Sequence, residues 1–447
     1  MTMPLNQSVL EDRASQLVEA AKKAGADAAD AVAITAMSLG VDIREGAVEE
    51  TERSEADDLT LRVFVGGRVA SISTNRVGVA DEMAERAVTM ARATPQDPYA
   101  GLADESRLAM EMPDLDMLDV TEVTADMLSE RARHAEAAGL AVSGVSKSGG
   151  ASASWRLAGM VLATSHGFSG AYLTSRHGVS MTAIAGDGTG MERDYDYDFR
   201  THLSDMEDPS DIGQRAGERA VRRINPRKLE TRTGTVFYEP RAARSLLGHF
   251  TGAINGSGIA RGTSFLKDAL GKSVFAPTIN IVDDPGRKRG AASRPFDGEG
   301  VACQPLRLIE NGVLNHWLLD SATARELGLE TNGRAGRGGA GPSPGSTNLV
   351  LKPGELSPET LLGQLDDGLY ITDLIGHGVN GVTGDYSRGA SGFWVENGEL
   401  TFPVSEMTIA GNLTDMFARI IAADDLDDRY SVCTPTLAIE GLTIGGR

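Results

Sequence analysis

Apolar residues recur every three or four positions in several separate segments, and this spacing predicts amphipathic helices. Ser8 can cap the first of them and Gly25 can end it. The second stops before the Thr94-Pro95 pair, because proline disfavours helical backbone in the residue that precedes it. The predicted helices span residues 8–23, 81–92, 125–138, 212–223 and 241–253.

Other segments alternate between apolar and polar residues, which is the period of a strand with one buried face. Short strands are predicted at 30–35 and 59–65, and the acidic stretch 49–58 between them is interpreted as a turn region. Residues 151–198 predict a meander of antiparallel strands, with turns at His166-Gly167, His177-Gly178 and Gly186-Asp187-Gly188. A short strand at 235–238 precedes a glycine-rich, strand-rich stretch that runs to residue 447.

Helices and strands are grouped along the chain rather than strictly alternating, which predicts an α+β fold with mostly antiparallel sheets and flanking helices. We expect three domains: a mixed α and β domain at 1–120, a helix with antiparallel strands at 121–230, and a strand-dominated domain at 231–447. Residues 99–119 are interpreted as a linker.

The net charge narrows the range of functions. The chain of 447 residues has 43 Lys and Arg against 63 Asp and Glu, a formal charge of −20, which disfavours direct binding to nucleic acid. A local basic stretch is interpreted as a solvated helix face. It comprises Arg215, Arg219, Arg222, Arg223, Arg227 and Lys228.

No leader peptide or apolar membrane span is recognised, so we expect a cytoplasmic protein without membrane contact.

The metal-binding residue types are scattered. No two of the seven histidines are closer than eleven residues, so no local pair of zinc ligands exists, although a site assembled from distant histidines stays open. Cys303 and Cys433 form no CxxC pair, which excludes a disulfide scaffold or a cysteine-rich zinc site.

Two short glycine-containing motifs match known functional patterns, but neither lies in the structural context that its pattern requires. Residues 341–345 read GPSPG, but prolines flank Ser343 and a strand follows, whereas a nucleophile elbow needs a strand-to-helix turn. GxGxxG occurs at 336–341 and 376–381, and neither match precedes a helical pattern, as dinucleotide binding requires.

Several carboxylate pairs attract attention, but each is interpreted as an exposed turn rather than as acid/base machinery, because carboxylates are abundant in this chain. They are Asp297-Gly298-Glu299, Asp283-Asp284, and Asp424-Asp425 with Asp427-Asp428. Spacing alone therefore predicts no active site.

The C-terminal half carries longer and more particular motifs, and through them the chain resembles the TldD/PmbA family, in its PmbA (TldE) branch. The motifs are 294–300 (RPFDGEG), 308–314 (LIENGVL), 380–398 (NGVTGDYSRGASGFWVENG), 403–413 (PVSEMTIAGNL) and 434–446 (TPTLAIEGLTIGG). The resemblance implies a cytoplasmic protease system of two related subunits, associated with peptide maturation, antitoxin degradation and the name "modulator of DNA gyrase".

In that family the TldD-type subunit carries an HExxxH helix, binds zinc and cleaves unfolded peptides in a closed chamber. If Leu246-Leu247 sets the alignment, HExxxH falls on 248–253, which here reads GHFTGA. Both histidine ligands and the glutamate are then missing. The resemblance therefore implies no catalytic residue, no metal ligand and no bound cofactor in this chain, with zinc on a TldD-type partner. Cys433 lies in the region of the family's cysteine ligand but is not aligned to it.

The resemblance thus implies a non-catalytic subunit that helps to shape the chamber and to bind peptide. Asp385, Ser387, Arg388 and Asn412 are the residues predicted to face the chamber or the partner, with turn and capping roles as the alternative. Glycine-rich strands suit a peptide added as an extra strand. Two other readings stay open: an autonomous hydrolase with a metal-free or non-local site, and a non-enzymatic homodimer. Whether the chain is an enzyme by itself is left undecided.

Overall fold

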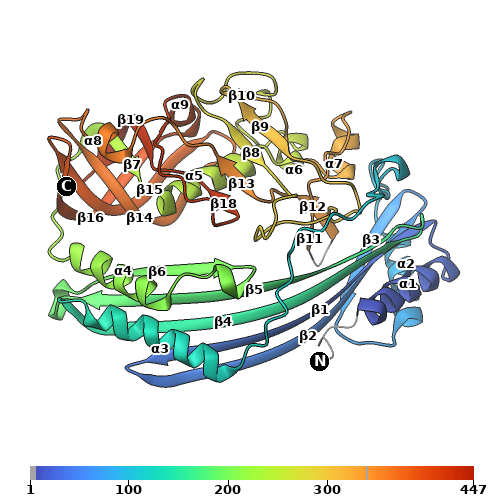
Figure 1. The fold of residues 1–447 in the computed structure, drawn as a ribbon. Coiled ribbons are helices and arrows are strands. Elements are labelled where there is room, and N and C mark those ends of the chain that lie inside the picture. The colour runs from blue at the N-terminus through green and yellow to red at the C-terminus, as the bar shows by residue number, and fades with distance from the viewer. Residues whose placement is uncertain (1–6, 339–340, 447) are drawn as a thin grey trace.

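A computed structural model describes residues 7–338 and 341–446 of the chain. The N-terminal half, up to residue 230, is built on one antiparallel sheet of six strands in the order β3-β2-β1-β4-β5-β6. The sheet curves around the C-terminal half (Figure 1). Its strands are β1 (Ala28–Arg44), β2 (Ala47–Val65), β3 (Arg68–Thr74), β4 (Val145–Thr164), β5 (Ser169–Ala185) and β6 (Glu192–Arg200).

Four helices cover one face of this sheet. Helices α1 (Gln7–Lys23) and α2 (Ala80–Ala93) pack on one end, and α3 (Ala125–Ala141) and α4 (Pro209–Arg222) pack on the other. Odd-numbered residues of β1, such as Ala31 and Ile43, point into both cores, because successive side chains of a strand alternate between its faces. The even-numbered residues face the C-terminal half. Short 3-10 turns lie at Glu105–Arg107, Gly188–Gly190 and Leu203–Asp205.

Helices α3 and α4 cross at a very short distance. A Cβ atom added to Gly213 would lie 1.9 Å from the carbonyl oxygen of Ala135 and 3.0 Å from the amide nitrogen of Gly139. Only glycine therefore fits at this crossing.

The C-terminal half, from residue 231, contains a second six-stranded sheet, a five-stranded sheet and a hairpin. The order β16-β15-β14-β7-β19-β17, with a further pairing of β16 to β19, closes five strands into a ring. These strands are β7 (Arg232–Tyr238), β14 (Asp367–Val379), β15 (Asp385–Glu396), β16 (Glu399–Asn412), β17 (Ile421–Ala422) and β19 (Leu437–Gly445). Only the β7–β14 pairing in this sheet is parallel among the described residues.

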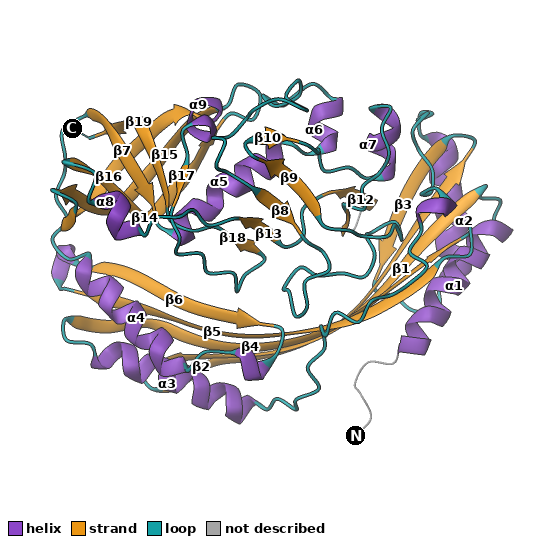
Figure 2. Cartoon of the chain, turned by 45° about the horizontal axis from the view of Figure 1, so that its top comes forward, coloured by secondary structure: helices purple, strands orange, loops and turns teal. Residues whose placement is uncertain are grey.

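The smaller sheet has the order β10-β9-β8-β13-β18, and the hairpin pairs β11 with β12. Figure 2 shows α5 between the two sheets, where it lies within the largest apolar core. The strands are β8 (Ile281–Asp283), β9 (Leu306–Glu310), β10 (Val313–Leu314), β11 (Ala335–Gly338), β12 (Gly341–Pro344), β13 (Leu349–Leu351) and β18 (Val432–Cys433). The helices are α5 (Pro240–Ala253), α6 (Gly256–Ala260), α7 (Ser321–Glu326), α8 (Pro358–Leu362) and α9 (Leu413–Ala418).

The α+β class with mostly antiparallel sheets is confirmed. The domain division stays a prediction: the boundaries at 120 and 230 both fall in connecting segments, but the long sheet takes strands from both sides of the first. Within the described residues, no helix combines the length and the apolar character needed to cross a membrane.

Two turn predictions in the N-terminal half were wrong. Residues 49–58 are not a turn but belong to the first part of β2, where Ala56 pairs with Ala36 of β1. Both faces of this stretch are largely exposed, so its sequence lacks the alternation of a half-buried strand. His177-Gly178 lies inside β5, and Gly178 makes room for the ring of Phe199, which would lie 2.4 Å from an added Cβ.

The basic stretch is also different from the prediction of a solvated helix face. Arg215 and Arg219 of α4 both bind Asp196 at 2.6 Å, and Arg223 lies 3.3 Å from Asp194. The carboxylates come from β6, which the sequence pattern could not place beside α4. The remaining members are also engaged: Arg222 stacks on Phe393, Arg227 stacks on Phe402, and Lys228 pairs with Glu406.

Candidate functional site

Helix α5 is the natural centre of a candidate site, because the family resemblance places its metal motif there. Pro240 opens the helix at a position where no amide hydrogen is needed. Ala243, Leu246, Leu247 and Phe250 recur at three and four residues and are fully buried in the core of the C-terminal half. This apolar face fixes which side of the helix is left open.

The opposite face of α5 carries arginines in its first two turns and glycines in its last two. Gly248 and Gly252 are exposed and lie one helical turn apart. A Cβ atom added to either residue would have no atom within 4 Å, so the space beside them is open. The face therefore offers room for a ligand, but its glycines supply no side chain for chemistry.

His249 lies beside these glycines and points toward the ring of strands. Its ring meets that of Tyr386 edge-on with centroids 5.9 Å apart. Its Nε2 is buried and has no hydrogen-bond partner among the described residues. Burial lowers the pKa of His249, and the nearby Arg388 guanidinium lowers it further. The imidazole is therefore neutral at physiological pH.

The four predicted chamber residues separate into two groups. Strand β15 places Tyr386 and Arg388 on the face toward α5, whereas Asp385 and Ser387 alternate to the other face. Arg388 is thus brought close to His249. Ser387 is exposed on the other side of the strand.

Asp385 and Asn412 meet each other at the end of the β15–β16 pairing. The Asn412 amide donates to Asp385 Oδ1 at 3.2 Å and to the Thr383 carbonyl at 2.9 Å, while its Oδ1 accepts from the Thr414 amide and caps α9. Hydrogen bonds from Thr383 and Asn412 lower the pKa of Asp385. Turn and capping contacts thus engage both residues, and the chamber assignment of all four residues stays a prediction.

The residues around α5 do not fit a zinc ion. A catalytic zinc site needs three protein ligands, and α5 supplies one imidazole, beside the positive charge of Arg388. Cys433 lies on β18, which packs against α5, but its Sγ is 2.9 Å from the Tyr430 carbonyl and burial raises the pKa of its thiol. Across the ranges 7–338 and 341–446, no three His, Cys, Asp or Glu residues gather closely enough to hold a metal.

The rejected glycine motifs sit in strands and turns. Ser343 is exposed on β12 within a β-hairpin, which is not the strand-to-helix turn of a nucleophile elbow. The GxGxxG at 336–341 spans that hairpin, with residues 339–340 outside the described residues, and the second match covers the end of β14 and the following turn.

Two of the carboxylate predictions were wrong. Asp283 is not in an exposed turn but is fully buried at the end of β8, where it binds Arg334. The error at the Asp297–Glu299 turn is the more informative one. Asp297 and Glu299 do lie in a turn, but they are buried, with exposed fractions of 0% and 3%. Asp297 accepts hydrogen bonds from the backbone amides of Glu299, Val301 and Ala335 at 2.8 to 3.0 Å. Glu299 accepts from the Ser321 amide at 2.7 Å. The turn is buried because segments distant in sequence close over it.

The cover comes from the N-terminal half through a cluster of ionic side chains. Arg62 of β2 donates to its cross-strand partner Asp30 at 2.8 Å and lies 3.6 Å from Glu299. Arg337 of β11 binds both Asp30 and the Gly298 carbonyl. We call Asp30, Arg62, Glu299 and Arg337 the junction cluster, because it joins the two halves. Nothing in the spacing of these residues could have revealed it.

Because Asp297 and Glu299 are buried close together at this junction, we expect the stability of the chain to depend on pH. Burial, together with the charge of Glu299, raises the pKa of Asp297 to about 7 from an ordinary value of 3.8. The folded chain then binds a proton more tightly than the unfolded chain, so the free energy of unfolding should fall as the pH rises from about 4 to about 7. In Glu299→Gln the pKa of Asp297 should drop, and this dependence should become shallower.

Denaturant unfolding at a series of pH values measures the slope. Glu310→Gln is the control, because Glu310 is an exposed partner of Arg307 and should leave the slope unchanged. An identical slope in Glu299→Gln and the natural chain would contradict the coupling of Asp297 with Glu299.

Comparison with known proteins gives a consistent result. The chain matches PmbA/TldA metallopeptidase domain 1 at residues 29–91, the central domain at 118–224 and the C-terminal domain at 231–446. It is 36% identical over 445 residues to metalloprotease PmbA of Escherichia coli O157:H7, covering 99% of this chain and 97% of that protein.

Solved structures show the same fold. A protein of Bacteroides thetaiotaomicron named as a modulator of DNA gyrase is 27% identical with a TM-score of 0.90, covering 98% of this chain and 99% of that one. TldE of Thermococcus kodakarensis has a TM-score of 0.87 at 19% identity, covering 97% and 99%. The second likeness is one of fold alone.

Proposed function

This chain belongs to the PmbA/TldA metallopeptidase family, and from that premise we propose that it is the PmbA (TldE)-type subunit of a heterodimeric zinc peptidase acting on unfolded peptides. The partner is a TldD-type subunit that carries the HExxxH helix and the zinc. The complex works in the cytoplasm, in peptide maturation and antitoxin degradation.

The open face of α5 is the observation that carries this proposal. In the alignment given above, the two histidines and the glutamate of the catalytic branch correspond to Gly248, His249 and Ala253 of this helix. A zinc peptidase uses the metal to lower the pKa of a bound water and a carboxylate to accept its proton. The residues present here support neither step, so the chemistry is assigned to the partner.

This chain's own contribution is to bind the peptide and to complete the chamber. The glycine face of α5 leaves space for a peptide backbone, and an extended peptide can be held by main-chain hydrogen bonds without regard to its sequence. His249, next to Gly248 in the chain, lies close to Arg388 of β15.

The test is hydrolysis of a reduced, denatured protein by this chain alone, by a TldD-type subunit from the same genome alone, and by the mixture. We expect cleavage by the mixture only, and complete loss of cleavage when a chelator is added. Activity of this chain alone that resists the chelator would mean an autonomous hydrolase. A stable homodimer that neither binds nor activates the partner would also contradict the proposal.

His249→Ala serves as the metal control in the same experiment. Because His249 is not assigned as a ligand, we expect the zinc content of the mixed complex to be unchanged. A drop in zinc on this substitution would place a metal ligand in this chain.

A further inference from the structure

A pair of arginines on the long sheet stands apart from the other charged groups near it. Arg156 of β4 and Arg176 of β5 are direct partners in the antiparallel pairing. Ala153 and Val179 point into the core under α3 and α4, so Arg156 and Arg176, three residues away on each strand, point to the face toward the C-terminal half. Both arginines are exposed.

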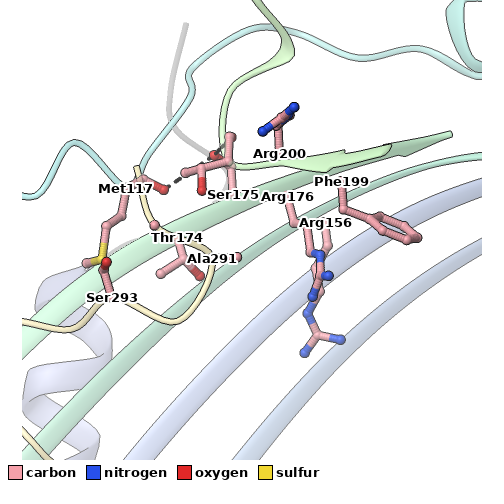
Figure 3. Close-up of a pocket in the computed structure, with 11 residues that line it drawn as sticks. Met117, Arg156, Thr174, Ser175, Arg176, Phe199, Arg200, Ala291 and Ser293 are labelled. Atoms are coloured by element: carbon pink, nitrogen blue, oxygen red, sulfur yellow. Dashed lines mark hydrogen bonds between the residues drawn. The ribbon is translucent and has the colours of Figure 1, made fainter. Parts of the chain in front are cut away.

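The two side chains line a pocket of about 190 Å³ between the sheet and residues 290–293 of the C-terminal half. Figure 3 shows them side by side, extending from neighbouring strands. Thr174, Met117 and Ser293 line the same pocket, and the Arg176 guanidinium lies 4.9 Å from the centre of the Phe199 ring. The third arginine at the pocket, Arg200, is paired with Asp198 at 3.0 Å.

Like charges directly opposite each other on a sheet are destabilising unless an anion lies between them. Several other arginines near this sheet have carboxylate partners within the chain: Arg219 binds Asp196, and Arg241 binds Asp194. Among the described residues, neither Arg156 nor Arg176 has a carboxylate within 4 Å. In a chain with a net charge of −20, two adjacent arginines without a carboxylate partner favour the binding of an external anion.

A series of side-chain contacts runs from the pocket to α5. The Phe199 ring lies 5.4 Å from the Tyr197 ring, and the Tyr197 hydroxyl accepts a hydrogen bond from Arg244 of α5 at 2.9 Å. Gly248 lies one helical turn beyond Arg244. These contacts place Tyr197 and Arg244 between the arginine pocket and the glycines of α5.

From this arrangement we propose that Arg156 and Arg176 bind a carboxylate of a peptide ligand. Guanidinium groups match the planar fork of a carboxylate, and the pocket has room for that group on a short stem. The carboxylate is supplied either by the peptide C-terminus or by an Asp or Glu side chain. The choice of a peptide as ligand rests on the proposed function.

The test is calorimetric titration of the full chain with three alanine tetrapeptides, all acetylated at the N-terminus. One has a free C-terminal carboxylate, one is amidated, and one is amidated and carries a single aspartate. We expect one or both acidic peptides to bind, and the double variant Arg156→Gln with Arg176→Gln to weaken that binding about tenfold. The neutral amide should bind weakly to both proteins.

Arg193→Gln is the matched control. Arg193 is an exposed arginine on β6 opposite Ile184 and lies outside the pocket, so this variant loses one charge from the same sheet and should bind like the natural chain. Equal affinity of the double variant and the natural chain would overturn the proposal, as would equal binding of the neutral and acidic peptides. Tighter binding of inorganic phosphate than of either acidic peptide would also overturn it.

Cleavage by the mixed complex is a separate readout. With the double variant, KM for the acidic peptide should rise about tenfold while kcat stays unchanged, because the arginines bind the ligand but do not touch the zinc. Cleavage without any change in KM would disprove the arginine site and leave the proposed function standing. Carboxylate binding by the arginine pair without any cleavage by the mixed complex would support the arginine site and disprove the proposed function.

Discussion

Replacing Arg334 with methionine is expected to lower the free energy of unfolding by about 3–5 kcal/mol, one of the largest effects available in this chain. Arg334 and Asp283 are both fully buried and bind each other. The other nitrogens of Arg334 donate to the carbonyls of Asn332, Gly333 and Gln304. Methionine fills a similar volume but leaves the Asp283 carboxylate in the core without its cation.

Denaturant unfolding measures this loss, and Arg307→Met is the matched control. Arg307 lies on β9, next to β8 in the same sheet, but its side chain is 72% exposed and its ion pair is with Glu310 at the surface. We expect that variant to change stability by about 0.5 kcal/mol or less. Adding Asp283→Leu to Arg334→Met should restore part of the lost stability, because no unpaired charge then remains buried. Equal effects of Arg334→Met and Arg307→Met would refute the role assigned to the buried pair.

The second large effect is expected from Asp30→Ala in the junction cluster. Burial alone would raise the pKa of Asp30, but Arg62 and Arg337 beside it bring the pKa below its ordinary value, so the carboxylate is charged and holds both guanidiniums. Alanine removes the carboxylate that both buried guanidiniums share, so Arg337 loses its acidic partner and Arg62 is left with Glu299 at 3.6 Å. We expect a loss of about 3–5 kcal/mol and faster proteolysis of the connecting segment 99–119.

Asp42→Ala provides the comparison for Asp30→Ala. Asp42 lies on the same face of β1, but its side chain accepts a hydrogen bond from the neutral Ser152 hydroxyl rather than from a cation. Its loss should lower stability by about 1 kcal/mol and leave the proteolysis rate unchanged. If both variants are cleaved at the same rate, Asp30 does not hold the halves together.

The helices could be predicted from the sequence because each is encoded by residues that lie close together in the chain. The predicted helix at 81–92 is found at Ala80–Ala93, and the one at 241–253 is found at Pro240–Ala253. For each of these helices, the repeating apolar residues and the flanking proline lie in the same short segment of the chain. Strand lengths were less accessible, since β2 begins twelve residues before its buried part.

The site was only partly predictable, because its residues meet through pairings between distant segments. Arg388 was identified from the sequence, but its neighbour His249 lies on a helix that the ring of strands brings close. Burial of Asp297 depends on cover by strands more than 200 residues earlier in the chain. Arg156 and Arg176 are twenty residues apart and become neighbours only through the β4–β5 pairing. Spacing along the chain contains none of this information.

The acidic part of β2 has a consequence for contacts between copies of the chain. Among the described residues, β3 pairs only with residues 59–65 of β2, so residues 47–58 have a strand on one side and unpaired backbone on the other. Such a free strand edge is a template for aggregation. This stretch contains six carboxylates and one arginine, so a second copy approaching edge to edge would set acid against acid. Electrostatic repulsion between these acidic stretches thus disfavours edge-to-edge strand pairing between two copies of the chain.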